Sequence, residues 1–176
     1  MKKAIFLDRD GTLIKDRGAL KNIGQVEFYK NIFDGLRRFQ KEYLLFIITN
    51  QPYIAKGMLK TSEVRKVHSY ILKKLREKRI IIKAVYFCPH KKEDNCDCRK
   101  PKPYFLNKAA EKYNIDLKAS YVIGDHLSDM ELALNAGSKG VYMLCGHGWE
   151  QYLKVRAIKD KRISICRNLC SALKRI

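Results

Sequence analysis

Two aspartates separated by a single residue follow the first apolar run of the chain and are its earliest sign of chemistry. Ala4 to Leu7 form that run, and Asp8, Asp10 and Gly11 come directly after it. Side chains at positions i and i+2 of an extended chain point the same way, so the two carboxylates are expected side by side at the end of a buried strand. Their repulsion would raise the pKa of one of them, and a divalent cation would relieve it. For this pair taken alone, a strand that ends in a polar turn is the simpler interpretation.

Three later apolar runs are also followed by polar residues that suit chemistry. These residues are Thr49 with Asn50, Arg99 with Lys100, and Asp125 with Asp129. In open parallel sheets, sites form outside the carboxyl ends of the strands, so all of these residues are expected on one rim. Phosphoryl transfer needs a nucleophile, an acid/base, metal ligands and donors for the phosphoryl oxygens, and this set supplies them. Taken singly, Asp125 would be a turn aspartate and Thr49 a strand end.

The hydrophobic pattern predicts the elements that position these residues. Apolar runs predict strands over 3–7, 44–49, 83–87, 120–125, 140–144 and 163–166. Helical spacing predicts helices over about 31–42 (which includes Tyr43 in its stripe), about 62–79, from 103, from about 128 to 137, and after 166. Thr61 or Ser62 is the expected N-cap of the second helix, and His68 is expected as a half-buried surface residue. The alternation predicts an α/β fold, a Rossmann-like doubly wound, mainly parallel sheet with helices on both faces, in one domain over 1–176.

Length and charge constrain the partner. The chain has 176 residues, and 37 Lys and Arg against 18 Asp and Glu give a net charge of +19. This charge favours an anionic partner such as a phosphorylated metabolite, nucleic acid or an acidic membrane. The basic residues are not interleaved with aromatic ones, so the charge does not favour nucleic acid in particular. The chain lacks an apolar run of about 20 residues and its N-terminal run is too short for a signal peptide. A cytoplasmic protein without a membrane partner is therefore expected, and we expect it to be a monomer.

Four potential metal ligands crowd into eleven consecutive positions. Cys88, His90, Cys96 and Cys98 form the pattern C-x-H-x5-C-x-C. Three thiolates and an imidazole would complete a closed, tetrahedral zinc site of the structural kind. The histidine disfavours an iron–sulfur cluster, and the odd number of cysteines in a reducing compartment disfavours disulfides. Arg99 follows the last ligand directly, so the zinc would aim this guanidinium at a substrate anion.

The strand-end motifs, in this order, resemble those of the haloacid dehalogenase-like phosphatases. The matching motifs are Asp8-Arg9-Asp10-Gly11-Thr12, Thr49, Lys100, and Gly124-Asp125 with Asp129. The resemblance spans residues 5 to about 145. It implies that Asp8 is the nucleophile that forms an aspartyl-phosphate and that Asp10 is the acid/base. It also implies that Thr49 and Lys100 hold the phosphoryl oxygens. The implied Mg²⁺ ligands are Asp8, the backbone carbonyl of Asp10 and Asp125, with Asp129 behind them.

The zinc loop narrows the resemblance. Residues 88–103 are similar to the corresponding loop of the bacterial D-glycero-D-manno-heptose-1,7-bisphosphate phosphatases and of the histidinol-phosphate phosphatases, which have no cap domain. The segment 49–57 looks more like the heptose enzymes, which remove the 7-phosphate during the synthesis of lipopolysaccharide core and other surface heptoses. The substrate contacts that the resemblance implies are Asp16, Arg17, Gly18, Ala19, Thr49, Asn50, Gln51, Pro52, Arg99, Lys100 and His126.

Three of these residues depart from the pattern of the heptose enzymes. Ala19, Pro52 and His126 stand where tyrosine, serine and lysine are usual, which leaves the chemistry intact and affects the choice of sugar. Histidinol phosphate is the alternative substrate. A nucleic-acid 3′-phosphatase would use the net charge, but such relatives generally lack the zinc loop. A zinc-containing nucleic-acid-binding protein without catalysis leaves the four motifs unexplained. His147, between two glycines, could line a pocket, but an ordinary loop residue is the expectation.

Overall fold

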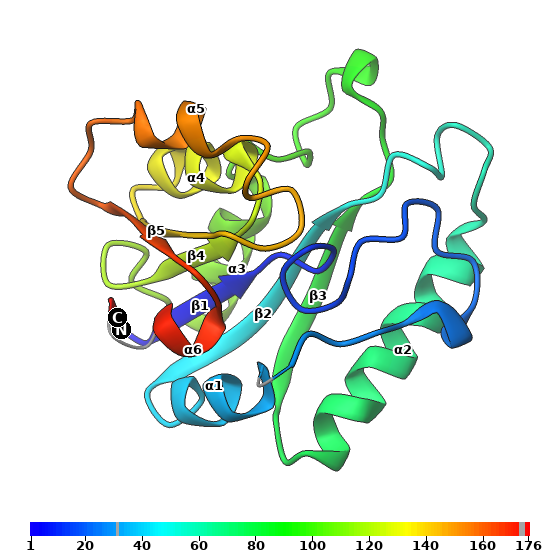
Figure 1. Ribbon diagram of the computed structural model, residues 1–176, viewed down its shortest axis with the longest axis horizontal. Coiled ribbons are helices and arrows are strands. Elements are labelled where there is room, and N and C mark those ends of the chain that lie inside the picture. The colour runs from blue at the N-terminus through cyan, green and yellow to red at the C-terminus, as the bar shows by residue number, and fades with distance from the viewer. Residues whose placement is uncertain (31, 173–174) are drawn as a thin grey trace.

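A sheet of parallel strands runs through the structure. The computed structural model describes residues 1–30, 32–172 and 175–176. Within them six strands lie in the order β3–β2–β1–β4–β5–β6, and every adjacent pair is parallel (Figure 1). The strands are β1 (Lys3–Leu7), β2 (Tyr43–Asn50), β3 (Ile82–Cys88), β4 (Tyr121–Gly124), β5 (Lys139–Met143) and β6 (Ile163–Cys166). This is the strand order of the Rossmann fold, so the predicted fold class is confirmed.

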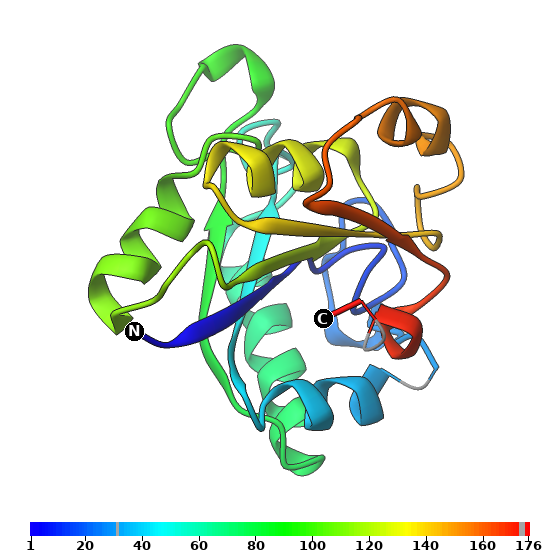
Figure 2. The same ribbon diagram turned by 90° about the vertical axis from the view of Figure 1, so that its left-hand side faces the viewer.

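Helices cover both faces of the sheet. Alternate side chains of β1 belong to different cores, Ile5 and Leu7 to one and Ala4 and Phe6 to the other. On the first face lie α1 (Ile32–Phe39), α2 (Thr61–Glu77) and α6 (Leu169–Ala172), and on the second α3 (Tyr104–Tyr113) and α4 (Leu127–Asn135) (Figure 2). The short α5 (Tyr152–Arg156) packs Val155 with Met130 and Tyr142. Single turns of 3-10 helix at Ile23–Gln25 and Lys92–Asp94 lie in the loops after β1 and β3.

The strand order fixes where the site forms. The chain passes from β1 outward to β2 and β3, and then returns to the other side of β1 with β4. Beyond the carboxyl ends of β1 and β4, the connections therefore leave in opposite directions and open a crevice. Asp8 follows β1 and Asp125 follows β4. The fold therefore brings the first and the last of the predicted motifs together at this crevice.

Several local predictions differ from the structure. The helix predicted over 31–42 ends at Phe39, and Tyr43, which the prediction included in its apolar stripe, begins β2. Residue 31 lies outside the described residues. Neither Thr61 nor Ser62 is the N-cap of α2; Lys60 is, and its backbone N–H donates to Glu63 Oε2 at 2.6 Å. His68 is buried rather than half-buried, because its ring packs against that of Phe87 on β3. The helix α5 was not predicted.

Among the described residues, none of the helices combines the length and the apolar character that a membrane crossing requires.

Candidate active site

Three buried aspartates and one buried lysine meet where β1 and β4 end. Carboxylate oxygens of Asp8, Asp125 and Asp129 all lie within 4.8 Å of one another. Lys100 Nζ donates to Asp8 Oδ1 at 2.5 Å and to Asp129 Oδ1 at 2.6 Å. All four side chains are buried. Three carboxylates against one ammonium leave an excess of negative charge, which a divalent cation with oxygen ligands would balance.

The ionisation of this cluster reflects its burial. Burial raises the pKa of the Asp8 carboxyl well above its usual range; the Lys100 ammonium opposes this shift, and the Asp129 and Asp125 carboxylates add to it. Burial and then Asp129 raise the pKa of Asp125 to about 6. Burial alone would lower the pKa of Lys100, but the Asp129 and Asp8 carboxylates outweigh it and raise the pKa, so Lys100 stays charged. The cluster is thus arranged to receive further positive charge, which would favour its ionised carboxylates.

Asp8 is held at the edge of a cavity with only one of its carboxylate oxygens in a hydrogen bond among the described residues. Its backbone N–H donates to the carbonyl of Ile123 at 2.9 Å, which ties the residue after β1 to β4. In the part of the chain that the structure describes, its Oδ1 is bonded to Lys100 and its Oδ2 accepts no hydrogen bond. Asp8 also lines a cavity of about 590 Å³. One carboxylate oxygen is therefore held by a cation while the other is available as a nucleophile.

The Asp125 carboxylate is enclosed by backbone that tolerates no side chain. Thr12 Oγ1 donates to its Oδ1 at 2.9 Å, and the backbone N–H of His147 donates to its Oδ2 at 2.8 Å. A Cβ atom on Gly11 would come within 2.1 Å of Asp125 Oδ2, and one on Gly146 within 2.2 Å. Both glycines have positive φ angles, +81° and +49°. The loops after β1 and β5 thus approach Asp125 as closely as backbone can, and glycine is required at both positions.

Asp10 lies in a separate group beside this cluster. Gln51 Nε2 donates to Asp10 Oδ2 at 2.9 Å and to Thr49 Oγ1 at 2.8 Å, and Thr49 Oγ1 donates to Asp10 Oδ2 at 3.4 Å. Arg9 forms an ion pair with Asp10, with Nη2 and Oδ2 2.7 Å apart. The Oε1 atom of Gln51 is buried and has no partner among the described residues. The two aspartates of the D-x-D pair therefore have different neighbours: Lys100 contacts Asp8, whereas Arg9 and Gln51 contact Asp10.

A cavity of about 590 Å³ opens above both groups. It is lined by Asp8, Asp10, Thr49, Lys100 and Asp125, and of the predicted substrate contacts by Asp16, Gly18, Asn50, Gln51, Pro52, Arg99 and His126. Arg17 and Ala19 do not line it, and Arg17 is instead paired with Glu27 at 2.8 Å. The amide of Asn50 is bonded to the backbone of Lys100 in both directions, at 3.1 and 3.3 Å, so it holds the loop that carries the lysine.

Two histidines form one side of the mouth of the cavity. The rings of His126 and His147 lie edge to face with centroids 6.4 Å apart. His147 bridges Glu150 Oε2 at 3.0 Å and Asp16 Oδ2 at 3.1 Å, and these contacts raise its pKa. Burial lowers the pKa of His126. The expectation that His147 is an ordinary loop residue was wrong, because the loop after β5 turns it into the cavity and across to the loop after β1.

The cysteine-rich loop forms a compact set of ligand atoms. One ligand atom from each of Cys88, His90, Cys96 and Cys98 lies within 4.8 Å of the others. The sulfur atoms of Cys88 and Cys96 are 3.5 Å apart, those of Cys96 and Cys98 are 3.6 Å apart, and His90 Nδ1 lies 3.3 Å from Cys98 Sγ. Tetrahedral zinc with Zn–S bonds of about 2.3 Å requires ligand separations of about 3.8 Å, so the set fits this ion.

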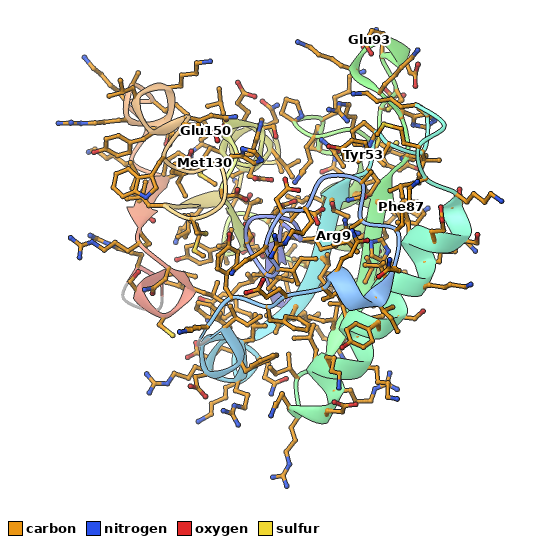
Figure 3. All side chains as sticks on the ribbon, turned by 45° about the vertical axis from the view of Figure 1, so that its right-hand side comes forward. Arg9, Tyr53, Phe87, Glu93, Met130 and Glu150 are labelled. Atoms are coloured by element: carbon orange, nitrogen blue, oxygen red, sulfur yellow. The ribbon has the colours of Figure 1, made fainter. Side chains whose placement is uncertain are left out.

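The loop also positions a cation. Arg99 Nη1 donates to the carbonyl oxygen of His90 at 3.1 Å, and Arg99 lines the cavity. The backbone N–H of Gln51 donates to the carbonyl of Cys88 at 2.7 Å. The cysteine-rich loop is therefore joined both to the loop after β2 and to the guanidinium that faces the cavity. In Figure 3, Glu93 marks the outer end of this loop, Tyr53 lies below it on the same side, and Glu150 lies across from both.

Sequence reasoning missed several residues of the site. Arg9 is among the largest fully buried side chains of the described residues, although the D-x-D motif in which it lies assigns roles to its aspartates alone. Tyr53, Lys92, Asn95, Lys102, Ser128, Glu131 and His147 also line the cavity. An arginine between two motif aspartates was a usable signal, because an arginine at a strand end needs a partner. The others lie on loops whose course the hydrophobic pattern does not specify.

Fold and site together define a hydrolase of the haloacid dehalogenase-like class. A family model described as HAD-hydrolase-like matches residues 97–169. The chain is 45% identical over 135 residues to the D-glycero-alpha-D-manno-heptose-1,7-bisphosphate 7-phosphatase of Campylobacter jejuni, which covers 76% of this chain and 77% of that protein. It is 37% identical over 166 residues to the corresponding beta enzyme of Helicobacter pylori strain J99, with 90% and 95% covered. The chain belongs to the D-glycero-D-manno-heptose-1,7-bisphosphate 7-phosphatase family.

A solved structure agrees with this assignment. The D,D-heptose 1,7-bisphosphate phosphatase of B. bronchiseptica, complexed with magnesium and phosphate, is 26% identical and superposes with a TM-score of 0.89 over 98% of this chain and 97% of that one. The prediction of an enzyme of this family is confirmed, and the alternative of a nucleic-acid-binding module without catalysis is set aside.

Proposed function

We propose that the protein hydrolyses the 7-phosphate of D-glycero-D-manno-heptose 1,7-bisphosphate through an aspartyl-phosphate on Asp8. The observation that carries the proposal is the pairing of Asp8 with Lys100 in a cavity that also holds Asp10, Thr49 and Asp125. Membership of the family supports the substrate, since its named members act on this bisphosphate.

In the first step, the free Oδ2 of Asp8 attacks phosphorus. An Oδ–P bond forms, the bond from phosphorus to the sugar oxygen O7 breaks, and Asp10 gives its proton to O7 as the alcohol leaves. Lys100 neutralises charge on the phosphoryl oxygens and on Asp8, and Thr49 donates its hydroxyl to one of those oxygens. Gln51 holds both Asp10 and Thr49, so the acid and the hydroxyl keep a fixed separation.

In the second step, water attacks the aspartyl-phosphate. Asp10, now ionised, takes a proton from the water, the Oδ–P bond of Asp8 breaks, and inorganic phosphate leaves with the enzyme regenerated. Asp8 and Asp10 thus need different environments, one that presents a bare oxygen and one that can both give and accept a proton. Their partners differ accordingly, since Lys100 contacts Asp8, and Arg9 and Gln51 contact Asp10.

Mg²⁺ fits the acidic cluster. Asp8, Asp125 and the backbone carbonyl of Asp10 would hold it, and it would offset the repulsion between the carboxylates and the phosphate dianion. We place Asp129 behind these ligands, because its Oδ1 accepts from Lys100 Nζ and its Oδ2 from the backbone N–H of His126 at 3.1 Å. Asp129 would then orient the lysine rather than bind the metal.

We propose that the remainder of the substrate contacts the cavity mouth. Arg99 suits a bidentate contact with an anionic group, and His126 and His147 face it from the side of β4 and β5. Asp16, Gly18 and Pro52 also line this cavity. A bisphosphate offers one phosphate to the Asp8 group and a second anion to this cationic mouth, which a monophosphate such as histidinol phosphate does not.

A phosphate-release assay tests this function. The α and β anomers of D-glycero-D-manno-heptose 1,7-bisphosphate, fructose bisphosphate and histidinol phosphate would be compared with and without Mg²⁺. We expect at least about tenfold higher kcat/KM for one heptose anomer, equal to about 1.4 kcal/mol, release of the 7-phosphate by ³¹P NMR, and no turnover without Mg²⁺. A preference for histidinol phosphate, or release of the 1-phosphate, would contradict the proposal.

We further propose that Cys88, His90, Cys96 and Cys98 bind one structural zinc ion. Protein purified without chelators is expected to contain one zinc per chain by elemental analysis. Cys98→Ser is expected to lose zinc and about 10- to 100-fold in kcat/KM, because Arg99 then loses its fixed position. Cys166→Ala, in β6 and outside the loop, is the control and is expected to retain both. Wild-type protein free of zinc would contradict the assignment.

We also propose that residues 1–176 act as one domain without a cap, in the cytoplasm and as a monomer. One chain supplies every residue of the proposed site. The thiols of the zinc set need a reducing compartment to stay available as ligands. The proposed substrate is a phosphorylated sugar, and neither a membrane nor nucleic acid is needed to complete the site.

A further inference from the structure

Arg9 is a buried arginine with few partners. Its side chain is 2% exposed, and among the described residues its ion-pair partner is Asp10 alone. Arg9 Nε lies 3.0 and 2.9 Å from the two carboxylate oxygens of Asp10, and Nη2 donates to Oδ1 at 2.8 Å. A buried guanidinium is costly unless its charge is paired and its donors are satisfied. The fork of the arginine therefore fixes the plane of the Asp10 carboxylate.

The far end of the guanidinium is held by His68. Arg9 Nη1 lies 2.9 Å from His68 Nε2. Because the guanidinium only donates, Nε2 must accept, and His68 must be neutral with its proton on Nδ1. Burial and then the Arg9 charge lower the pKa of His68 to about 3, so the ring stays in this form at neutral pH.

His68 is itself fixed by packing rather than by contact with the cavity. It lies on α2, it is 7% exposed, and its ring is at 64° to that of Phe87 with centroids 5.4 Å apart. It does not line the cavity. Figure 3 shows Arg9 in the interior of the molecule with Phe87 beside it on β3. Although His68 lies at an apolar spacing on α2, it is not an ordinary core residue, because its hydrogen bond to Arg9 connects it with Asp10.

We infer that His68 is a positioning residue for the acid/base, acting through Arg9 on Asp10. Gln51 and Thr49 hold Asp10 Oδ2 from one side, and Arg9 holds the carboxylate from the other. Without the acceptor on His68, Nη1 loses its partner and the guanidinium is free to turn, so the carboxylate plane turns with it. This inference rests on the proposed role of Asp10 as proton donor to the leaving alcohol.

The inference predicts a dependence on the leaving group. An alkyl phosphate needs a proton on its leaving oxygen, whereas p-nitrophenyl phosphate expels a stable anion without one. Because kcat/KM reports steps up to formation of the aspartyl-phosphate, later use of Asp10 as a base does not enter. Misplacement of Asp10 should therefore lower kcat/KM for the alkyl ester much more than for the aryl ester.

The test compares His68→Phe with His68→Gln on a sugar phosphate and on p-nitrophenyl phosphate. His68→Phe keeps the ring and removes the acceptor; we expect a loss of about 10- to 100-fold on the sugar phosphate and less than about threefold on the aryl ester. His68→Gln places an oxygen near the position of Nε2 and is expected to restore both to within about threefold. If His68→Phe does not fold, His68→Asn replaces it, because the asparagine side chain is too short for its oxygen to reach Arg9.

Controls separate positioning from stability and from the proposed function. Val67→Ala, next to His68 in the core of α2, is expected to lower the melting temperature without changing the ratio of the two substrates. Equal losses on both esters, no loss, or failure of His68→Gln to restore the ratio would overturn the inference while wild-type turnover upholds the function. A wild type that cleaves neither ester would refute both.

Discussion

Asp8→Asn is expected to lower phosphate release from every ester by about 10⁴-fold or more. The substitution removes the nucleophilic oxygen and leaves a side chain of the same size. Its Oδ1 can still accept from Lys100 Nζ, and Lys100 keeps its contact with Asp129. Turnover would be measured as inorganic phosphate released at saturating substrate and Mg²⁺, with freshly purified protein.

The fold is expected to tolerate this change. Burial already raises the pKa of the Asp8 carboxyl well above its usual range, so the metal-free protein disfavours a charge at this position. A neutral amide should therefore leave the melting temperature of the metal-free protein equal or slightly higher. Asp34→Asn, on the exposed face of α1 where Asp34 pairs with Arg37, is the matched control and should keep full activity. Near-wild-type phosphate release by Asp8→Asn would rule out the aspartyl-phosphate pathway.

The fold and the centre of the site were predictable because they depend on short-range patterns. Buried parallel strands produce unbroken apolar runs, and the residue after each run must lie at the rim of the sheet. These patterns therefore place Asp8, Thr49 and Asp125 together, although they are far apart in the sequence. The cysteine set was predictable for the same reason, since its ligands lie within eleven residues of one another.

The rest depends on contacts that no pattern encodes. Whether Arg17 or His147 faces the cavity is decided by the course of loops, and in both cases an acidic partner settles it: Glu27 draws Arg17 away, while Asp16 draws His147 in. His68 sits at an apolar spacing on α2, so periodicity alone makes it part of the stripe. Its function depends on Arg9, 59 positions earlier in the chain, and only the packing of α2 on β3 brings the two together.

The contacts of Lys100 and those of Arg9 and Gln51 form two separate groups in the site. In the proposed mechanism, the Lys100 group serves the charge of the site, because it brings an ammonium to Asp8 and leaves an excess of negative charge that a cation would balance. The group of Arg9 and Gln51 would serve the proton transfer, because it fixes the Asp10 carboxylate without contacting Asp8. Asp8 and Asp10 thus belong to separate groups of contacts. Arg9, which lies between them in the sequence, belongs to the group of Asp10.

Lys100→Met is expected to abolish turnover and to destabilise the protein by about 3–5 kcal/mol, the usual cost of leaving buried charges without their partner. Lys100 is 7% exposed and its ammonium contacts Asp8 and Asp129 together. Methionine keeps most of the length and none of the charge. Chemical denaturation at pH 7.5 would measure the stability, and phosphate release the activity. Lys74→Met, an exposed residue of α2 paired with Glu77, is the control and should change neither.

The stability of Lys100→Met should also depend on pH in a defined direction. Lys100 lowers the pKa of Asp8 against the effect of burial, so its removal raises that pKa further. A carboxyl whose pKa is higher in the folded than in the unfolded state binds its proton better when folded, so the protein loses stability as pH rises through the folded pKa. The deficit relative to wild type should therefore be smaller at pH 5 than at pH 7.5. A deficit that is equal at both pH values would mean that Lys100 acts by packing its side chain rather than by neutralising the aspartates.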